Sequence, residues 1–183
     1  MGRPVNHDSY SDATIRTILS DVKVIAMVGA SANAVRPSYF VLKYLLDRGY
    51  RVHPVNPGLA GQEILGCRVY ASLADIPEPV DMVDIFRNVE AAAAIVEEAI
   101  ALPARPKVIW MQLGVRNDAA AARAEDAGMT VVMNRCPKIE LRRLSSEIAW
   151  MGVNSRTISA KRAPQLKAGK FQKLGLRTTF QRD

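Results

Sequence analysis

Residues 24–37 carry the feature that most constrains the fold, because an apolar run leads through a turn of small residues to the start of a helix. The run Val-Ile-Ala-Met-Val is followed by Gly29-Ala30-Ser31, and Pro37 suits the first position of a helix. A strand, turn and helix in this order present backbone N–H groups and a helix N-terminus to an anion, usually the pyrophosphate of a nucleotide. We therefore expect a nucleotide-containing cofactor at this turn.

Apolar runs alternate with helical patterns through the middle of the chain, which is typical of βαβ units and a parallel sheet. Strands are expected at residues 24–28, 51–55, 80–86, 108–112 and 130–133. Helices are expected at about 12–19, at 38–48, from 88 to before 103, from 117 to 128 and at 137–150. The sequence thus predicts an α/β fold, a Rossmann-like open parallel five-stranded sheet with helices on both faces and a strand order of about 3-2-1-4-5.

The chain of 183 residues is large enough for one substantial core, since 49% of its residues are hydrophobic. We expect a Rossmann-like cofactor-binding domain at 23–150, with a helical N-terminal extension at 1–22 packed on it and a basic C-terminal extension at 151–183. No apolar run approaches the roughly 18 residues that a membrane-spanning helix needs, and the first residues lack the apolar segment of a secretory signal. A cytoplasmic protein without a membrane partner is expected.

The net charge of +7 comes from the C-terminal extension. Residues 156–183 hold eight Lys or Arg and one acid, whereas residues 1–155 hold seventeen residues of each sign. A basic tail can contact RNA, a membrane surface or a second subunit. Its aromatics, Phe171 and Phe180, lack the regular spacing that base stacking uses, so we favour a solvated extension or one that clasps a partner in a homodimer over one that binds nucleic acid.

The chain has two cysteines, Cys67 and Cys136, and two histidines, His7 and His53. This number supports neither a disulfide framework nor a zinc site of the CxxC type, so no metal site is expected. Cys136 comes just before a predicted helix, where the local field favours a thiolate. The alternatives are a reactive thiol and a small buried side chain that fills a corner between helix and sheet.

Candidate ligand contacts follow the first two strands. Gly29 permits a close approach of the backbone, Ser31 offers a hydroxyl to a phosphate, and Arg36 stands beside the helix start. After the second strand, Asn56-Pro57 occupies the place where an NAD-binding Rossmann domain carries an acid on the ribose. The missing acid counts against NAD.

The later strands end in further candidates. Phe86-Arg87 follows the third strand, where Phe86 either lies along an extended, amide-bearing ligand or belongs to the core. Gln112 ends the fourth strand, where its side chain or a neighbouring backbone group can bond the amides of such a ligand. All these positions fall at the carboxyl ends of strands, where ligands of open α/β sheets bind.

Together these segments resemble the small bacterial CoA-binding proteins of the YccU-like kind, which are similar to the CoA-binding domain of the succinyl-CoA synthetase α subunit. The resemblance is carried by Val-Gly-Ala-Ser at 28–31, Arg-Pro-Ser-Tyr at 36–39, Gly-Tyr-Arg-Val at 49–52, Pro-Val-Asn-Pro at 54–57, Glu-Ile-Leu-Gly at 63–66, Val-Asp-Met-Val-Asp-Ile-Phe-Arg at 80–87, Trp-Met-Gln-Leu-Gly-Val at 110–115 and Val-Met-Asn-Arg-Cys-Pro at 132–137. It implies that the pyrophosphate is held by Gly29, Ala30 and Ser31 with Arg36, that the adenosine end is flanked by Asn56 and Pro57, and that the pantetheine arm passes Phe86 and Arg87.

The resemblance favours non-catalytic binding of coenzyme A or acyl-CoA, because CoA carries a 3′-phosphate that an acid after the second strand would repel. Neither His7 nor His53 stands in a context that suggests the phosphorylated histidine of the synthetase, and nothing resembles a P-loop, so no catalytic residue is expected. The alternative is an NAD(P)-dependent oxidoreductase or an NAD(P)-binding regulatory domain, since the fold class serves both ligands. A third hypothesis is nucleic-acid binding through the tail.

Overall fold

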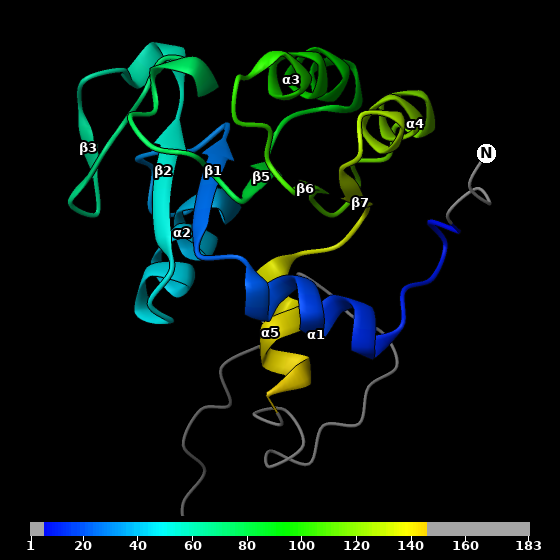
Figure 1. The fold of residues 1–183 in the computed structure, drawn as a ribbon. Coiled ribbons are helices and arrows are strands. Elements are labelled where there is room, and N and C mark those ends of the chain that lie inside the picture. Colours follow the sequence, from blue (N-terminus) through cyan, green and yellow to red (C-terminus); the bar gives the residue numbers. More distant parts are fainter. Residues whose placement is uncertain (1–5, 146–183) are drawn as a thin grey trace, which may run out of the picture.

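Five parallel strands form the centre of the structure, a computed structural model that describes residues 6–145 (Figure 1). They lie side by side in the order β2-β1-β5-β6-β7, and their bounds are Val24–Val28 for β1, Arg51–Val55 for β2, Met82–Ile85 for β5, Val108–Met111 for β6 and Thr130–Val132 for β7. A small antiparallel pair, β3 (Glu63–Ile64) and β4 (Cys67–Arg68), stands apart. The predicted α/β, Rossmann-like parallel sheet is confirmed.

The order of the strands refines the expectation. The strand predicted at 80–86 pairs directly with β1, with Met82 opposite Ile25, so the five predicted strands stand in the order 2-1-3-4-5. The place beyond β2 is taken by Tyr70, which forms an isolated parallel bridge with Val55. With this bridge counted as the third strand, the sheet reads 3-2-1-4-5-6, with β5, β6 and β7 as the last three strands. The segment after β2 contains too few helix-forming residues to form a full crossover helix, and it returns along the edge of the sheet instead.

Within residues 6–145, five α-helices surround the sheet, and each begins within two residues of its predicted start. Their bounds are Asp12–Asp21 for α1, Pro37–Asp47 for α2, Val89–Ala101 for α3, Asp118–Asp126 for α4 and Pro137–Leu144 for α5. The expected caps are present: Asn88 accepts a hydrogen bond from the N–H of Ala91 at 3.1 Å, and Asn117 accepts one from Ala120 at 2.9 Å. The expected end of α5, at 150, lies outside the described residues.

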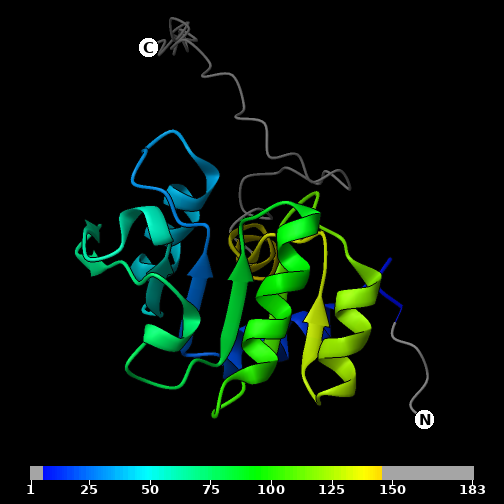
Figure 2. The same ribbon diagram turned by 90° about the horizontal axis from the view of Figure 1, so that it is seen from above.

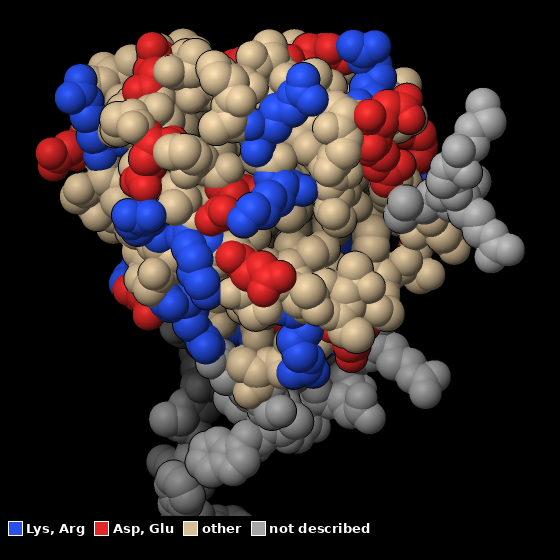
Figure 3. All heavy atoms as spheres, in the orientation of Figure 1, with Lys and Arg blue, Asp and Glu red and all other residues tan. Residues whose placement is uncertain are grey.

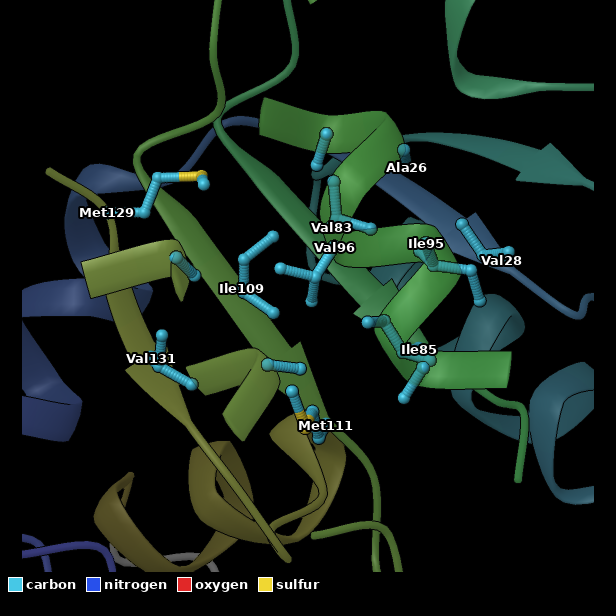
Figure 4. Packing of buried hydrophobic residues seen from close by; sticks show 14 of the residues in the cluster. Ala26, Val28, Val83, Ile85, Ile95, Val96, Ile109, Met111, Met129 and Val131 are labelled. Carbon is cyan, nitrogen blue, oxygen red and sulfur yellow. The ribbon is translucent and has the colours of Figure 1, made fainter. Parts of the chain in front are cut away.

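Two layers of helices sandwich the sheet, as the two ribbon views show (Figures 1 and 2). Helices α3 and α4 pack on one face, over a core that Figure 4 shows in close view and that includes Ala26, Val28, Val83, Ile85, Ile95, Val96, Ile109, Met111 and Val131. Helices α1, α2 and α5 pack on the other face, over Ile25, Met27, Met82, Trp110 and Val132. Alternate residues of each strand therefore face different helical layers.

The structure describes part of the predicted N-terminal extension at 1–22 and most of the predicted domain at 23–150, but not the predicted extension at 151–183. Helix α1 buries Ile15 and Leu19 against the domain, and its Asp12 pairs with Arg143 of α5 at 2.7 Å. Acidic and basic side chains intermingle on the face shown in Figure 3. The basic extension lies outside the described residues, and its role stays a prediction. Among residues 6–145, no helix has the length and apolar character to cross a membrane.

Candidate cofactor-binding site

The turn after β1 lies directly against the turn after β5. Gly29 has a φ of +87°, and a Cβ built there would stand 2.5 Å from the carbonyl oxygen of Phe86 and 2.9 Å from Cδ of Arg87. The N–H of Phe86 donates to the carbonyl of Val28 at 2.8 Å. Both the positive φ and the close approach require glycine. Gly29 therefore lets the turn after β1 approach the backbone of Phe86 and the side chain of Arg87, and its contact with a ligand stays a prediction.

Asn56 ties the turn after β2 to the turn after β1. Its Nδ2 donates to the carbonyl of Ala30 at 2.8 Å, and its Oδ1 accepts from the N–H of Gly58 at 3.0 Å. The N–H of Gly29 in turn donates to Val55 at 2.9 Å. The predicted residues Gly29, Ala30, Asn56, Phe86 and Arg87 are therefore gathered by three adjacent strand ends.

The loop that leads from Ser31 to α2 is organised by its own side chains. Ser31 Oγ accepts a hydrogen bond from the N–H of Asn33 at 3.2 Å, and Asn33 Oδ1 accepts one from Val35 at 3.0 Å. Arg36 is the N-cap residue of α2 but forms no side-chain cap, and Pro37 occupies the first turn. The first N–H groups of an α-helix have no partner within the helix, so this end of α2 is suited to an anion.

Two guanidinium groups beside these turns are unpaired within residues 6–145. Arg36 and Arg87 are both exposed, and neither guanidinium forms a hydrogen bond or ion pair with another described residue. Most other arginines of this part of the chain do have such partners; Arg51, for example, pairs with Glu78 at 3.0 Å. Unpaired guanidinium groups favour phosphate or carboxylate ligands.

Gln112 joins the ends of two neighbouring strands, β5 and β6. Its Nε2 donates to Oδ1 of Asp84 at 2.9 Å, and its side chain is buried. Its N–H donates to the carbonyl of Ile85 at 3.3 Å, so backbone and side chain both join the ends of β5 and β6. The Nε2 group is therefore occupied within the sheet, and a bond from Gln112 or a neighbouring backbone group to a ligand amide stays a prediction.

Asp84 is the functional candidate that sequence reasoning missed. It is fully buried, and burial raises the pKa of its carboxyl to about 8, against the opposing effect of the hydrogen bond from Gln112. Its Oδ2 has no hydrogen-bond partner among the described residues. The signal was present in the sequence, because an acid inside the apolar run at 80–86 breaks the pattern of a buried strand.

Cys136 differs from the reactive thiol that was one of its two expected forms. It is the N-cap residue of α5 and is 6% exposed. Burial raises the pKa of the thiol to about 11, and it outweighs the lowering effect of the N–H groups of Ile139 and Lys138. The expected effect of the helix start is present but is outweighed by burial, so the structure favours the second alternative, a small buried side chain between helix and sheet.

Other parts of the described surface offer little to a metal or to the predicted ligand. Among residues 6–145, no group of three or more His, Cys, Asp or Glu side chains could hold a metal ion. One hollow lies along the β4 edge, beside Arg68, Tyr70 and Asp75, and another lies between α1, α2 and α5. Neither hollow is lined by a residue that the sequence predicts for the cofactor.

These strand ends, with glycine at the point of closest approach and arginines around it, belong to a Rossmann-like domain, whose ligands bind at this edge of the sheet. The family model described as "CoA binding domain" matches residues 23–142. The chain therefore belongs to the CoA-binding domain family.

Individual relatives agree with this family. The chain is 38% identical over 129 residues to the "Uncharacterized protein YneT" of Bacillus subtilis strain 168. The matched region covers 70% of this chain and 93% of YneT. A solved structure called "hypothetical protein from Pyrococcus horikoshii OT3" is similar with a TM-score of 0.71 and 40% identity, covering 79% of this chain and 99% of that one. The chain is also 34% identical over 84 residues to the alpha subunit of an ADP-forming acetate–CoA ligase of Pyrococcus furiosus, but this is 18% of the subunit.

Proposed function

We propose that this protein binds coenzyme A or acyl-CoA at the carboxyl edge of its sheet, without catalysing a reaction. The observation that carries the proposal is the contact of Gly29 with the Phe86-Arg87 turn. At this contact, a turn without a side chain lies beside the N-terminus of α2 and beside Arg36 and Arg87, which have no partner within residues 6–145. Membership of the CoA-binding domain family supports the choice of ligand.

The charges at the site suit CoA in particular. CoA carries a pyrophosphate and a 3′-phosphate, and Arg36 and Arg87 are available to meet them. Asn56 stands where an acid would bond the ribose of NAD, and its amide is already held by Ala30 and Gly58. An amide here tolerates a phosphate on the ribose, whereas a carboxylate would repel it.

The remaining predicted contacts complete the proposed path. The turn at Gly29-Ala30-Ser31 would hold the pyrophosphate, Asn56 and Pro57 would flank the adenosine, and half-buried Phe86 would lie along the pantetheine arm. The buried Cys136 and Gln112 would support this path from below rather than contact its amides. Such a carrier or sensor would act in the cytoplasm, in contact with free CoA or acyl-CoA.

The similarity to the acetate–CoA ligase does not extend the proposal to catalysis, since it covers 18% of the ligase subunit.

The second candidate is an NAD(P)-binding regulatory domain. The exposed Arg36 and Arg87 favour NADP over NAD as its ligand, because they could meet the phosphate on the ribose of NADP. The two candidates differ in whether the pantetheine part adds affinity.

Native mass spectrometry of the purified full chain tests the proposal. We expect a bound species with the mass of CoA or an acyl-CoA, or its appearance after CoA is added. A competition between CoA, NAD and NADP at equal concentration then decides between the two candidates. Retention of NADP in place of CoA would overturn the proposal.

A further inference from the structure

Asp84 lies in the dry centre of the sheet, two residues before the Phe86-Arg87 turn. In the register of the sheet, its neighbours are Met27 on β1 and Trp110 on β6, which are both fully buried. Its side chain shares the face of the sheet that α1, α2 and α5 cover, because it alternates with Val83 and Ile85, which face α3 and α4. Such a site is costly for an acid, since a buried carboxylate loses its hydration.

The hydrogen bonds of Asp84 suit a neutral acid. Oδ1 accepts from Gln112 Nε2 at 2.9 Å, whereas Oδ2 has no acceptor or donor partner among the described residues. A carboxylate with only one hydrogen bond and no cation would be poorly stabilised there. Protonation removes the charge and keeps the bond to Gln112.

Among the described residues, no cation pairs with Asp84: burial raises the pKa of its carboxyl, and the hydrogen bond from Gln112 lowers it. The half-buried Lys138 of α5 lies over the rings of Phe40 and Tyr44, 5.7 and 5.9 Å from their centres. On α5, Glu140 is buried but is paired with Arg143 at 2.8 Å, and Cys136 is a thiol whose pKa Asp84 helps to raise. On α2, Tyr39 and Tyr44 are half-buried and do not act on Asp84. On α1, Asp12 is exposed and pairs with Arg143 at 2.7 Å.

Asp84 is linked to the proposed site through the backbone. Gln112, its partner, donates its own N–H to Ile85, and the next residue, Phe86, meets Gly29. A charge on Asp84 would draw water toward the ends of β5 and β6. It would also place a negative charge beneath a site that is built to receive phosphates.

We propose that Asp84 is a positioning residue that holds a proton in the ligand-competent protein: the neutral acid, with Gln112, keeps the ends of β5 and β6 in place, and loss of the proton lowers ligand affinity. The part of this inference that concerns affinity rests on the proposed CoA function. The part that concerns the proton does not.

The ligand arm of the test is a calorimetric titration of the full chain with CoA between pH 6.5 and 9.5. Asp84→Asn keeps a neutral side chain of the same shape, and Asp81→Asn, at the opposite end of the same strand region, is the matched control. With a pKa of about 8, about one tenth of the protein is protonated at pH 9, so the Kd of the wild type should rise about tenfold there. We expect Asp84→Asn to lack this rise and Asp81→Asn to retain it. Equal pH profiles for wild type and Asp84→Asn would overturn the affinity part, and titration of CoA itself cancels in the comparison.

The second arm needs no ligand. Since the folded carboxyl has a pKa of about 8 and the unfolded one 3.8, the folded protein binds the proton more tightly, and the wild type should lose stability as pH rises from about 4 to 8. Asp84→Asn should lack this loss, and the infrared C=O band of a protonated carboxyl at pH 6 should be absent from it. If the wild type lacks that band, or has the same stability profile as Asp84→Asn, the claim that Asp84 holds a proton is overturned. If no variant binds CoA at any pH, the proposed function fails, and this arm still decides whether Asp84 holds a proton.

Discussion

Gly29 and Phe86 approach so closely that a Cβ on Gly29 would stand 2.5 Å from the carbonyl oxygen of Phe86. This contact joins the first strand of the chain to the strand that lies beside it in the sheet, β5. It also fixes where the turn after β1 can present its backbone to a ligand. The central glycine of the site is therefore required by packing within the protein as well as by the ligand proposed for it.

Gly29→Ala should destabilise the protein by about 3 kcal/mol, because a left-handed backbone costs roughly 1–2 kcal/mol and the forced displacement of Phe86 adds a similar amount. Gly49→Ala is the matched control, since Gly49 has a φ of +85° but no atom within 4 Å of its built Cβ. It should cost about 1 kcal/mol. Urea unfolding measures both variants, and equal losses would show that the contact with Phe86 has no energetic consequence.

Arg36→Ala and Arg87→Ala should each weaken CoA binding about tenfold, because a hydrogen bond to a charged group contributes roughly 1.5 kcal/mol or more. Their stability should stay within about 0.5 kcal/mol of the wild type, since neither side chain is paired among the described residues. Lys43→Ala removes the same charge from α2, where Lys43 pairs with Asp47 at 3.0 Å, and should leave CoA affinity unchanged. Calorimetry measures the CoA affinity of all three variants. An equal loss in Lys43→Ala would show that the two arginines act only through overall charge and not through contact with CoA.

Asn56→Asp should lower both stability and CoA affinity. The substituted carboxylate would face the carbonyl of Ala30, which now accepts the Asn56 amide at 2.8 Å, so a loss of about 1–2 kcal/mol is expected. It would also repel a ribose phosphate. Asn88→Asp introduces the same charge at the N-cap of α3, where a carboxylate can still accept the N–H of Ala91. It should change stability and CoA affinity little. CoA affinity that is indifferent to Asn56→Asp would place the adenosine elsewhere.

Cys136 should resist alkylation in the folded protein. Its pKa of about 11 instead of 9.0 lowers the thiolate fraction at neutral pH about a hundredfold, and its side chain is buried. In a Cys67→Ala variant, intact mass after treatment with iodoacetamide at pH 7.5 should show no label until denaturant is added. Rapid labelling of the folded variant would restore the reactive thiol that we exclude.

The sequence was most informative where structure is local. The bounds of β1 and β2, the caps at Asn88 and Asn117 and the glycine turn after β1 all depend on neighbours within a few residues, and each is present as predicted. The other three strands are one to three residues shorter than predicted. The same holds for the position of the candidate residues at one edge of the sheet, because parallel strands bring their carboxyl ends together.

The lateral contacts were harder to predict. The pairing of Asp84 with Gln112 depends on β5 and β6 being neighbours in a given register, which no local pattern encodes. The bridge between Tyr70 and Val55 likewise depends on how an irregular segment returns to the sheet edge. For Cys136 the sequence left a reactive thiol and a buried side chain as alternatives, since a position before a helix indicates the local field but says nothing of the layer that covers it.

Calorimetric titration of the full chain with CoA, NADP and NAD in parallel tests the central claim most directly. The account predicts saturable one-to-one binding of CoA that is tighter than that of either nicotinamide nucleotide and that weakens in Arg36→Ala and Arg87→Ala. Absence of saturable CoA binding at millimolar ligand, or tighter binding of NADP than of CoA, would contradict it.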